Sequence, residues 1–211
     1  MSEDEIREAV VRWSRSLFER RFTVGSSGNI SVRLDDGYII TPTNSCLGFL
    51  KAGKLSRLDR SGAHVAGDAP SKELPLHLAF YEARATANAV VHLHSTYATA
   101  LSCLADVDPA DAMAPITPYM VMRLGRVPVI DYVRPGSAEI APLIRARAAD
   151  HPAVLLANHG PVVAGVSLEA AVYAIEELEE TARLLMVTRG MNVRHLDAGQ
   201  IAELEQNFRL R

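Results

Sequence analysis

The stretch that most constrains the fold is an apolar run, residues 89–91, which leads into two histidines at positions 92 and 94. A run this short and this rich in β-branched residues predicts a buried strand. Because successive side chains of a strand point to opposite faces, His92 and His94 should share one face and Leu93 should lie on the other. Two imidazoles at the end of one strand can chelate a metal ion, although two histidines hydrogen-bonded to backbone are the simpler interpretation of this pattern alone.

The composition is that of a globular protein with one α/β domain: 211 residues, 48% hydrophobic, net charge −3. No basic cluster indicates a nucleic-acid partner, and no run approaches the ~18 apolar residues of a membrane span. The acidic N-terminus is unlike a signal peptide, so we expect a cytoplasmic protein. Cys46 and Cys103 have apolar neighbours and no CxxC spacing, which predicts reduced thiols in the core.

Periodicity predicts a single domain over residues 1–211, with a mixed sheet covered by helices on both faces. Helices are expected over residues 3–21, 96–104, 137–149, 167–188 and 197–208, with another that begins near Leu74. Strands are expected over residues 30–34, 38–41, 127–132 and 153–157, besides the histidine strand, and residues 162–164 are expected to continue as a paired strand. Residues 47–67 are predicted as short strands and loops, and residues 106–118 as a loop.

Three polar loops interrupt this pattern, at residues 27–29, 43–44 and 71–72. Each offers backbone N–H groups, hydroxyls or an ammonium group, and convergent donors of this kind suit a phosphate or carboxylate. Each loop alone is an ordinary turn. Glu73 follows the third loop where a helix begins, and by itself it would be a first-turn glutamate interacting with the helix dipole.

Three of the seven histidines end apolar strands: His92, His94 and His159. Three neutral imidazoles with one open position form a catalytic rather than a structural zinc site. Spacing does not bring His159 beside His92, because that requires the two strands to be neighbours in one sheet. The other four histidines are expected at the surface or as capping groups: His64, His77, His151 and His195.

Five motifs resemble the class II aldolase/adducin family in their order and spacing. They are Ser27-Gly28-Asn29-Ile30-Ser31, Thr41-Pro42-Thr43-Asn44, Pro70-Ser71-Lys72-Glu73, His92-Leu93-His94-Ser95 and Asn158-His159-Gly160-Pro161. The resemblance covers about residues 5–205. Within the family the chain looks closest to the decarboxylases of 3-oxo-tetronate 4-phosphate, on segments 70–73, 94–96, 100–104, 117–119 and 176–182. The fuculose- and rhamnulose-phosphate aldolases and the ribulose-phosphate 4-epimerases look more distant.

The resemblance implies an α/β fold of the class II aldolase/adducin head type, a three-layer αβα sandwich around a mixed, mainly antiparallel sheet. It implies that His92, His94 and His159 bind zinc or another divalent transition metal. Glu73 corresponds to a further ligand that serves as catalytic acid/base once substrate displaces it. The residues that correspond to the phosphate-binding loops are Gly28, Asn29, Thr43, Asn44, Ser71 and Lys72.

The resemblance also implies a homo-oligomer, a C4 tetramer with each site where two subunits meet. Tyr119, a catalytic candidate, and the tail near Phe208 are then expected to reach a neighbouring subunit's site. Two positions depart from the aldolase pattern. Lys72 replaces the second serine of fuculose-phosphate-type aldolases, which favours the decarboxylase branch. Asn44 stands where the family often has glycine, and asparagine tolerates a positive φ.

The function implied is that of a zinc-dependent lyase acting on a small phosphorylated sugar acid. It would decarboxylate 3-oxo-tetronate 4-phosphate to dihydroxyacetone phosphate and CO2 through a metal-stabilised enediolate. A sugar-phosphate aldolase passes through the same enediolate, so the metal site alone does not separate the two reactions. Two further alternatives are a non-catalytic adducin-like module, which would lack part of the ligand set, and a structural zinc site, which would be permanently closed by four protein ligands.

Overall fold

Eight strands form one sheet in the computed structural model, which describes residues 1–208. Their bounds are β1 Asn29–Leu34, β2 Gly37–Ile40, β3 Ser56–Asp59, β4 His64–Ala66, β5 Ala89–His92, β6 Val129–Ile130, β7 Ala153–Leu156 and β8 Gly160–Gly165. The strands lie in the order β4-β3-β2-β1-β5-β8-β7-β6. All neighbouring pairs are antiparallel except β6 and β7. The histidine strand β5 is therefore central, between β1 and β8.

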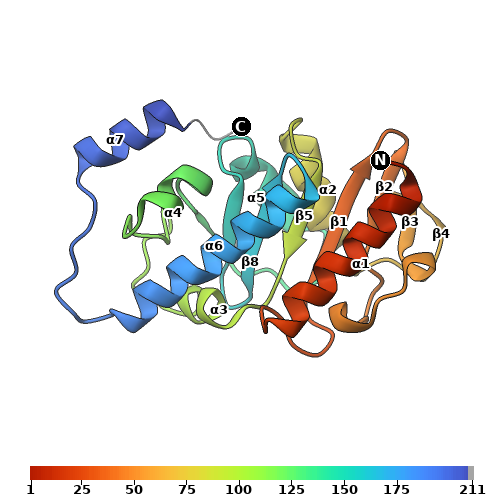
Figure 1. The fold of residues 1–211 in the computed structure, drawn as a ribbon, viewed down its shortest axis with the longest axis horizontal. Helices are drawn as coiled ribbons and strands as arrows, with labels where there is room; N and C mark the ends of the chain where they lie inside the picture. The colour runs from red at the N-terminus through yellow and green to blue at the C-terminus, as the bar shows by residue number, and fades with distance from the viewer. Residues whose placement is uncertain (209–211) are drawn as a thin grey trace.

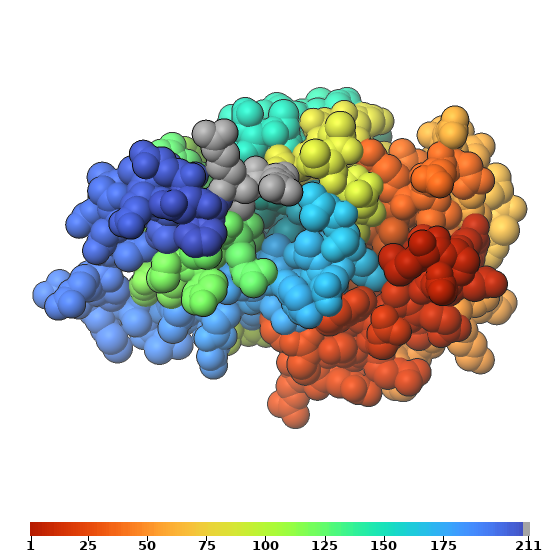
Figure 2. Space-filling model, turned by 45° about the horizontal axis from the view of Figure 1, so that its top comes forward, coloured from red at the N-terminus to blue at the C-terminus, as the bar shows by residue number. Residues whose placement is uncertain are grey.

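Helices cover both faces of the sheet (Figure 1). Helices α1 Glu3–Glu19, α3 Thr96–Ser102 and α6 Leu168–Val187 pack on one face, and α2 Leu74–Ala83 and α5 Ile140–Ala148 on the other. Helices α4 Pro118–Arg123 and α7 Ala198–Asn207 contact each other at one end of the molecule, where Figure 2 shows α7 over α4. Two 3₁₀ turns, η1 Leu47–Phe49 and η2 Ala52–Lys54, complete the elements. These layers confirm the predicted sandwich with a mixed, mainly antiparallel sheet.

Strand β5 contributes to both hydrophobic cores. Ala89 and Val91 pack into the core beneath α1, α3 and α6, and Val90 packs into the core beneath α2 and α5. This alternation is the one that the apolar run predicted. His92 follows Val90 by two residues, so it faces the α2 side, where it is fully buried. The register places Asn29 of β1 and Val162 of β8 opposite His92.

Several elements differ from their predicted extent. Helix α4 was not predicted: the expected loop ends at residue 118 and no element was expected over residues 119–126. Thr117 caps the helix by accepting a hydrogen bond from Met120 N at 3.3 Å, and Pro118 occupies its first turn. Strand β6 has two residues where six were predicted. The core prediction for the cysteines is wrong, because Cys103 is exposed and Cys46 is half-buried, and both are free thiols. Within residues 1–208, no helix is long and apolar enough to cross a membrane.

Candidate metal centre and anion cleft

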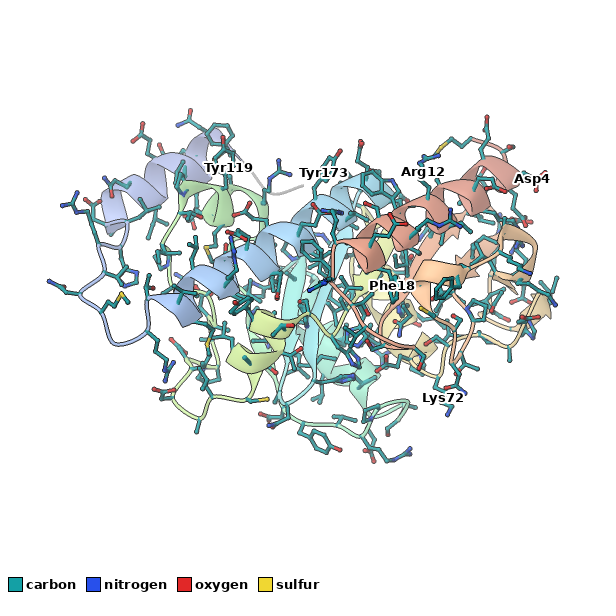
Figure 3. All side chains as sticks on the ribbon, turned by 60° about the horizontal axis from the view of Figure 1, so that its bottom comes forward. Asp4, Arg12, Phe18, Lys72, Tyr119 and Tyr173 are labelled. Atoms are coloured by element: carbon teal, nitrogen blue, oxygen red, sulfur yellow. The ribbon has the colours of Figure 1, made fainter. Side chains whose placement is uncertain are left out.

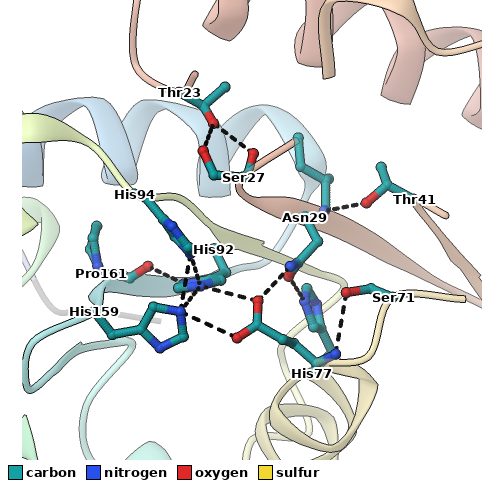
Figure 4. A network of polar contacts seen from close by, with 12 residues as sticks. Thr23, Ser27, Asn29, Thr41, Ser71, His77, His92, His94, His159 and Pro161 are labelled. Atoms are coloured by element: carbon teal, nitrogen blue, oxygen red, sulfur yellow. Dashed lines mark hydrogen bonds and ion pairs between the residues drawn. The ribbon is translucent and has the colours of Figure 1, made fainter. Parts of the chain in front are cut away.

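The three strand-end histidines meet at one point (Figure 4). His94 Nε2 lies 3.1 Å from His92 Nε2 and 3.0 Å from His159 Nε2, and the third separation, His92 Nε2 to His159 Nε2, is 3.3 Å. Strands β5 and β8 pair directly, and His159 lies in the turn just before β8. The neighbouring strands that the histidine cluster required are therefore present.

Hydrogen bonding orients the ring of His92. Its Nδ1 lies 2.9 Å from the carbonyl oxygen of Pro161, which only accepts hydrogen bonds. The hydrogen of the neutral ring is therefore on Nδ1, and Nε2 presents a lone pair to the other two imidazoles.

The turn that carries His159 is fixed by helix α3. Ser102 Oγ accepts a hydrogen bond from His159 N at 3.2 Å, and Thr99 Oγ1 donates to His159 O at the same distance. Asn158 has a φ of 56°, and Gly160 a φ of 152°. A Cβ on Gly160 would lie 2.4 Å from Leu93 O, so only glycine lets the turn approach β5 this closely.

Glu73, at the start of α2, reaches the same cluster. Its Oε2 lies 3.3 Å from His92 Nε2 and accepts a hydrogen bond from Asn29 Nδ2 at 2.8 Å, while Oε1 lies 3.4 Å from His159 Nε2. Burial raises the pKa of this carboxyl. The attraction and hydrogen bond of His92 in its protonated form, together with the hydrogen bond from Asn29, outweigh burial, so the pKa is lowered overall.

The donor set fits a divalent metal ion. The three Nε2 atoms lie 3.0–3.3 Å apart, close to the separation of about 3.3 Å expected for two nitrogens that each bind one zinc ion at about 2.0–2.1 Å. A Glu73 carboxylate oxygen lies within 4.8 Å of all three. Burial, followed by repulsion from His92 when that ring is protonated, lowers the pKa of both His94 and His159 to about 4. Neutral imidazoles are the form that binds metal. The four residues Glu73, His92, His94 and His159 thus form a cluster suitable for a divalent cation.

The three polar loops meet beside this cluster and line one cleft of about 170 Å³. All six residues expected to bind phosphate line it, together with Glu73 and His94: Gly28, Asn29, Thr43, Asn44, Ser71 and Lys72. Asn44 has a φ of 54°, so the asparagine adopts the positive φ for which glycine would otherwise be favoured. Hydrogen bonds from Thr43 N to Ala69 O at 2.9 Å and from Ser71 N to Thr41 O at 3.3 Å hold two of the loops side by side.

Gly28 brings the first loop against the histidine strand β5. It has a φ of 83°, and a Cβ built on it would lie 3.0 Å from His92 O and 3.1 Å from Leu93 Cδ2. The loop backbone therefore rests directly on the end of β5. Lys72, in the third loop, is exposed and labelled in Figure 3. Among the side chains that line the cleft, the ammonium group of Lys72 carries a formal positive charge.

The site has a further wall that was not predicted from the sequence. Residues 133–137, between β6 and α5, line a small recess that also contains Glu73 and His159. Pro135 and Gly136 also line the cleft of about 170 Å³ that is formed by the three polar loops. The Pro-Gly pair after a strand indicates a turn. Nothing in its spacing places that turn against Lys72, whose Cβ would lie 3.3 Å from a Cβ on Gly136.

The prediction that His77 is a surface or capping group is wrong. Its side chain is fully buried on α2, with Nε2 2.5 Å from Asn29 Oδ1 and Nδ1 2.7 Å from Ser31 Oγ. A signal was present, because residues 73, 77 and 81 follow one another at the helical spacing of four and residues 29 and 31 at the strand spacing of two.

Tyr119 and Phe208 are both exposed in this chain. Tyr119 is exposed on α4, and Figure 3 shows it far from Lys72. Phe208 is exposed just beyond α7. Their expected roles at a neighbouring subunit's site stay predictions.

Comparison with known proteins places this arrangement in a family. A model of the Class II Aldolase and Adducin N-terminal domain matches residues 8–186. The chain belongs to this family. Among class II aldolase/adducin relatives, the 3-oxo-tetronate 4-phosphate decarboxylase of Pectobacterium atrosepticum is 50% identical over 204 residues, covering 96% of this chain and 94% of the relative. An L-fuculose phosphate aldolase of Methanocaldococcus jannaschii is 34% identical over 181 residues, covering 86% and 96%.

The fold agrees with this assignment. The crystal structure of YgbL from Escherichia coli, 48% identical, superimposes with a TM-score of 0.94 and covers 96% of this chain and 98% of that one. The class II aldolase/adducin head type expected from the five motifs is therefore confirmed, as is the resemblance to the decarboxylase branch.

Proposed function

We propose that this protein is a zinc-dependent carboxy-lyase that converts 3-oxo-tetronate 4-phosphate to dihydroxyacetone phosphate and CO2. The observation that carries the proposal is full-length similarity, because decarboxylases of this name from five bacterial strains are 44–50% identical over 94–100% of the chain. The complete Glu73 and three-histidine cluster supports it, since carbon–carbon cleavage beside a ketone needs an electron sink.

His92, His94 and His159 would hold the cation, which supplies Lewis acidity at the ketone oxygen of the substrate. Zinc suits three imidazoles and a carboxylate, although other divalent transition metals accept similar donors. The six loop residues of the cleft would bind the phosphate, with Lys72 supplying charge and the backbone N–H groups supplying direction.

Decarboxylation breaks the bond between carbons 1 and 2, CO2 leaves, and the electron pair remains on carbon 2. Glu73 would then donate a proton to carbon 2, which gives the hydroxymethyl group of the product. When substrate displaces Glu73 from the imidazoles, the carboxyl loses the interactions with His92 and His159 that lower its pKa. It keeps the hydrogen bond from Asn29 and the burial that raises its pKa. This environment favours the protonated form that the step requires.

A sugar-phosphate aldolase is the second candidate, because the Methanocaldococcus jannaschii relative that carries this name is 34% identical to the chain. An aldolase would cleave a carbon–carbon bond with the same cluster but release an aldehyde, and it would need a proton relay for the aldehyde hydroxyl. A non-catalytic module fits less well, since all four candidate ligands are in place.

The oligomer belongs to the proposal as well. We infer a C4 homotetramer in which Tyr119 and the segment near Phe208 approach a neighbour's cleft. The exposure of both side chains, and the distance of Tyr119 from Lys72 of the same chain in Figure 3, support this arrangement.

The decisive experiment is incubation with 3-oxo-tetronate 4-phosphate and, separately, with L-fuculose 1-phosphate, with assays for CO2 and for aldehyde. We expect CO2 from the first and little aldehyde from the second. His92→Ala should lose both bound metal and turnover, whereas Glu73→Gln should keep most of the metal and lose turnover by about 100-fold or more. His64→Ala, at an exposed position on β4, is the matched control and should behave as wild type.

Cleavage of L-fuculose 1-phosphate without CO2 release would replace the decarboxylase by the aldolase. Normal turnover in Glu73→Gln would show that Glu73 does not carry the proton. Full activity in His92→Ala would remove the metal mechanism.

A further inference from the structure

A chain of hydrogen bonds runs through the protein interior to Glu73 from the side opposite the metal cluster. Tyr81 OH lies 2.7 Å from Ser31 Oγ, which lies 2.7 Å from His77 Nδ1. His77 Nε2 lies 2.5 Å from Asn29 Oδ1, and Asn29 Nδ2 donates to Glu73 Oε2 at 2.8 Å. The four groups behind Glu73 are all buried, and Figure 4 shows His77 and Asn29 beside the imidazoles.

The chemistry of the groups gives this chain a single direction. A carboxylate only accepts hydrogen bonds, so the amide nitrogen of Asn29 faces Glu73 and the amide oxygen faces His77. His77 Nε2 must then carry the hydrogen. In the neutral ring Nδ1 is an acceptor, so Ser31 donates to it, and Ser31 in turn accepts from Tyr81.

The neutral form of His77 follows from its surroundings. Burial, reinforced by repulsion from His92 when that ring is protonated, lowers the pKa of His77 to about 3. Glu73, the nearby carboxylate that would favour the charged ring, is separated from His77 by the Asn29 amide. The partners facing His77 from β1 are the amide of Asn29 and the hydroxyl of Ser31, neither of which carries charge.

We propose that His77 is a positioning residue for the reaction: by donating from Nε2 it holds the Asn29 amide with its nitrogen toward Glu73 and so fixes the carboxyl group that carries the proton. This assignment rests on the proposed role of Glu73. Without His77, the Asn29 amide can rotate and turn its oxygen toward the carboxylate. When substrate then displaces Glu73 from the imidazoles, no hydrogen bond from Asn29 remains to hold its carboxyl group in line with carbon 2 of the substrate.

The first test needs no substitution. In the side-chain ¹H–¹⁵N spectrum of ¹⁵N-labelled, zinc-loaded protein, we expect His77 as the neutral Nε2–H tautomer between about pH 6 and 8. A neutral Nδ1–H tautomer, or a charged ring, would overturn the assignment, because either form reverses or breaks the chain of donors.

The second test compares two substitutions at this position. His77→Leu removes the donor, whereas the side-chain amide of His77→Gln can still donate to Asn29 Oδ1. We expect His77→Leu to lower kcat about 10- to 100-fold with KM changed less than about twofold, and His77→Gln to recover most of that loss. Bound zinc and the far-UV spectrum, measured on both variants, confirm that the folded metal-binding state is compared.

A partial reaction separates this proposal from the proposed function. Glu73 should also exchange a hydroxymethyl hydrogen of dihydroxyacetone phosphate with D₂O, because protonation of carbon 2 is reversible and does not involve the leaving group. If His77→Leu slows this exchange while wild type releases no CO2, the decarboxylase proposal fails and the His77 assignment stands. If wild type releases CO2 and His77→Leu matches it in both reactions, or if His77→Gln is as impaired as His77→Leu, the assignment is overturned.

Discussion

A neutral imidazole that is buried without a facing charge couples folding to pH, and His77 is such a group. Its pKa is about 3 in the folded protein, against 6.5 for the free side chain, chiefly because burial disfavours the charged ring. Below pH 6.5 the unfolded chain therefore binds a proton that the folded chain excludes. The contribution of His77 to stability is complete above pH 6.5 and is lost as the pH falls toward 3.

We therefore expect the advantage of wild type over His77→Gln in unfolding free energy to shrink with acidification. The loss should be about 1.4 kcal/mol per pH unit below about pH 6. Urea unfolding of metal-free protein at several pH values between about 5 and 7.5 measures this slope. The three histidines of the metal cluster are present in both proteins, so their contributions to the pH dependence cancel in the difference. Parallel stability curves for the two proteins would contradict the prediction.

At this scale the sequence predicted the residues of the site better than their surroundings. The four candidate ligands and the six loop residues stand in motifs, so a resemblance could assign them. His77 has no motif, and its burial depends on Asn29 and Ser31 of another element, to which it is bonded only in the folded chain. Cys103 failed for the same reason, because apolar neighbours in sequence do not determine which face of α3 is covered.

Helix α3 links the metal cluster to α6 at the scale of elements. It begins two residues after His94, and its C-terminal end holds the turn that carries His159. Its N-terminus is held by Glu179 of α6, whose two carboxylate oxygens accept hydrogen bonds from Tyr97 N at 2.9 Å and Ala98 N at 2.8 Å. A carboxylate at this position accepts hydrogen bonds from N–H groups that have no partner within the helix, and its negative charge interacts favourably with the helix dipole.

We expect Glu179→Gln to lower the unfolding free energy by about 1–3 kcal/mol, because a neutral amide replaces a charged acceptor of two hydrogen bonds. Zinc affinity should fall together with the unfolding free energy, because α3 positions both His94 and the turn that carries His159. The matched control is Glu180→Gln, the next residue, whose ion pair with Arg183 is exposed and is expected to contribute less than about 1 kcal/mol. Equal effects of the two substitutions in chemical denaturation would refute this role for Glu179.

Element prediction succeeded where the pattern was long and failed where it was short. Helix α6 begins after the predicted cap Ser167 and ends within a residue of its predicted end. Helix α4 has six residues, too few for a periodic pattern, and it packs against α6 and α7. Strand β6 is likewise defined by its pairing with β7. Short elements of this kind are stabilised by tertiary contacts, which a local pattern does not contain.

The order of the strands is a property of the whole molecule, and it determines which residues meet at the site. His159 joins the cluster because β8 pairs with β5. Periodicity identifies strands but not their neighbours, so this step depended on the family resemblance. The same scale governs Tyr119, which does not line the cleft of its own chain and lies far from Lys72 in Figure 3. Under the proposed tetramer it would act at a neighbouring subunit's site.

Subunit mixing tests that arrangement. His92→Ala and Tyr119→Ala should each be nearly inactive alone. If the two chains are unfolded together in equal amounts and reassembled, about one quarter of the sites receive an intact metal cluster from one chain and an intact Tyr119 from its neighbour, for a ring in which each site is shared by two subunits. We therefore expect about a quarter of wild-type activity and, by light scattering, a mass of four chains.

The control mixture combines His92→Ala with Glu73→Gln. His92 and Glu73 belong to the cluster of a single chain. Every reassembled site therefore lacks one of the two native residues, and activity should stay absent. Recovery in the first mixture alone would place Tyr119 at a shared site. No recovery, with tetramers formed in both mixtures, would mean that Tyr119 acts within its own chain or not at all. A monomer in solution would exclude the shared site altogether, since the cleft would then be completed by one chain.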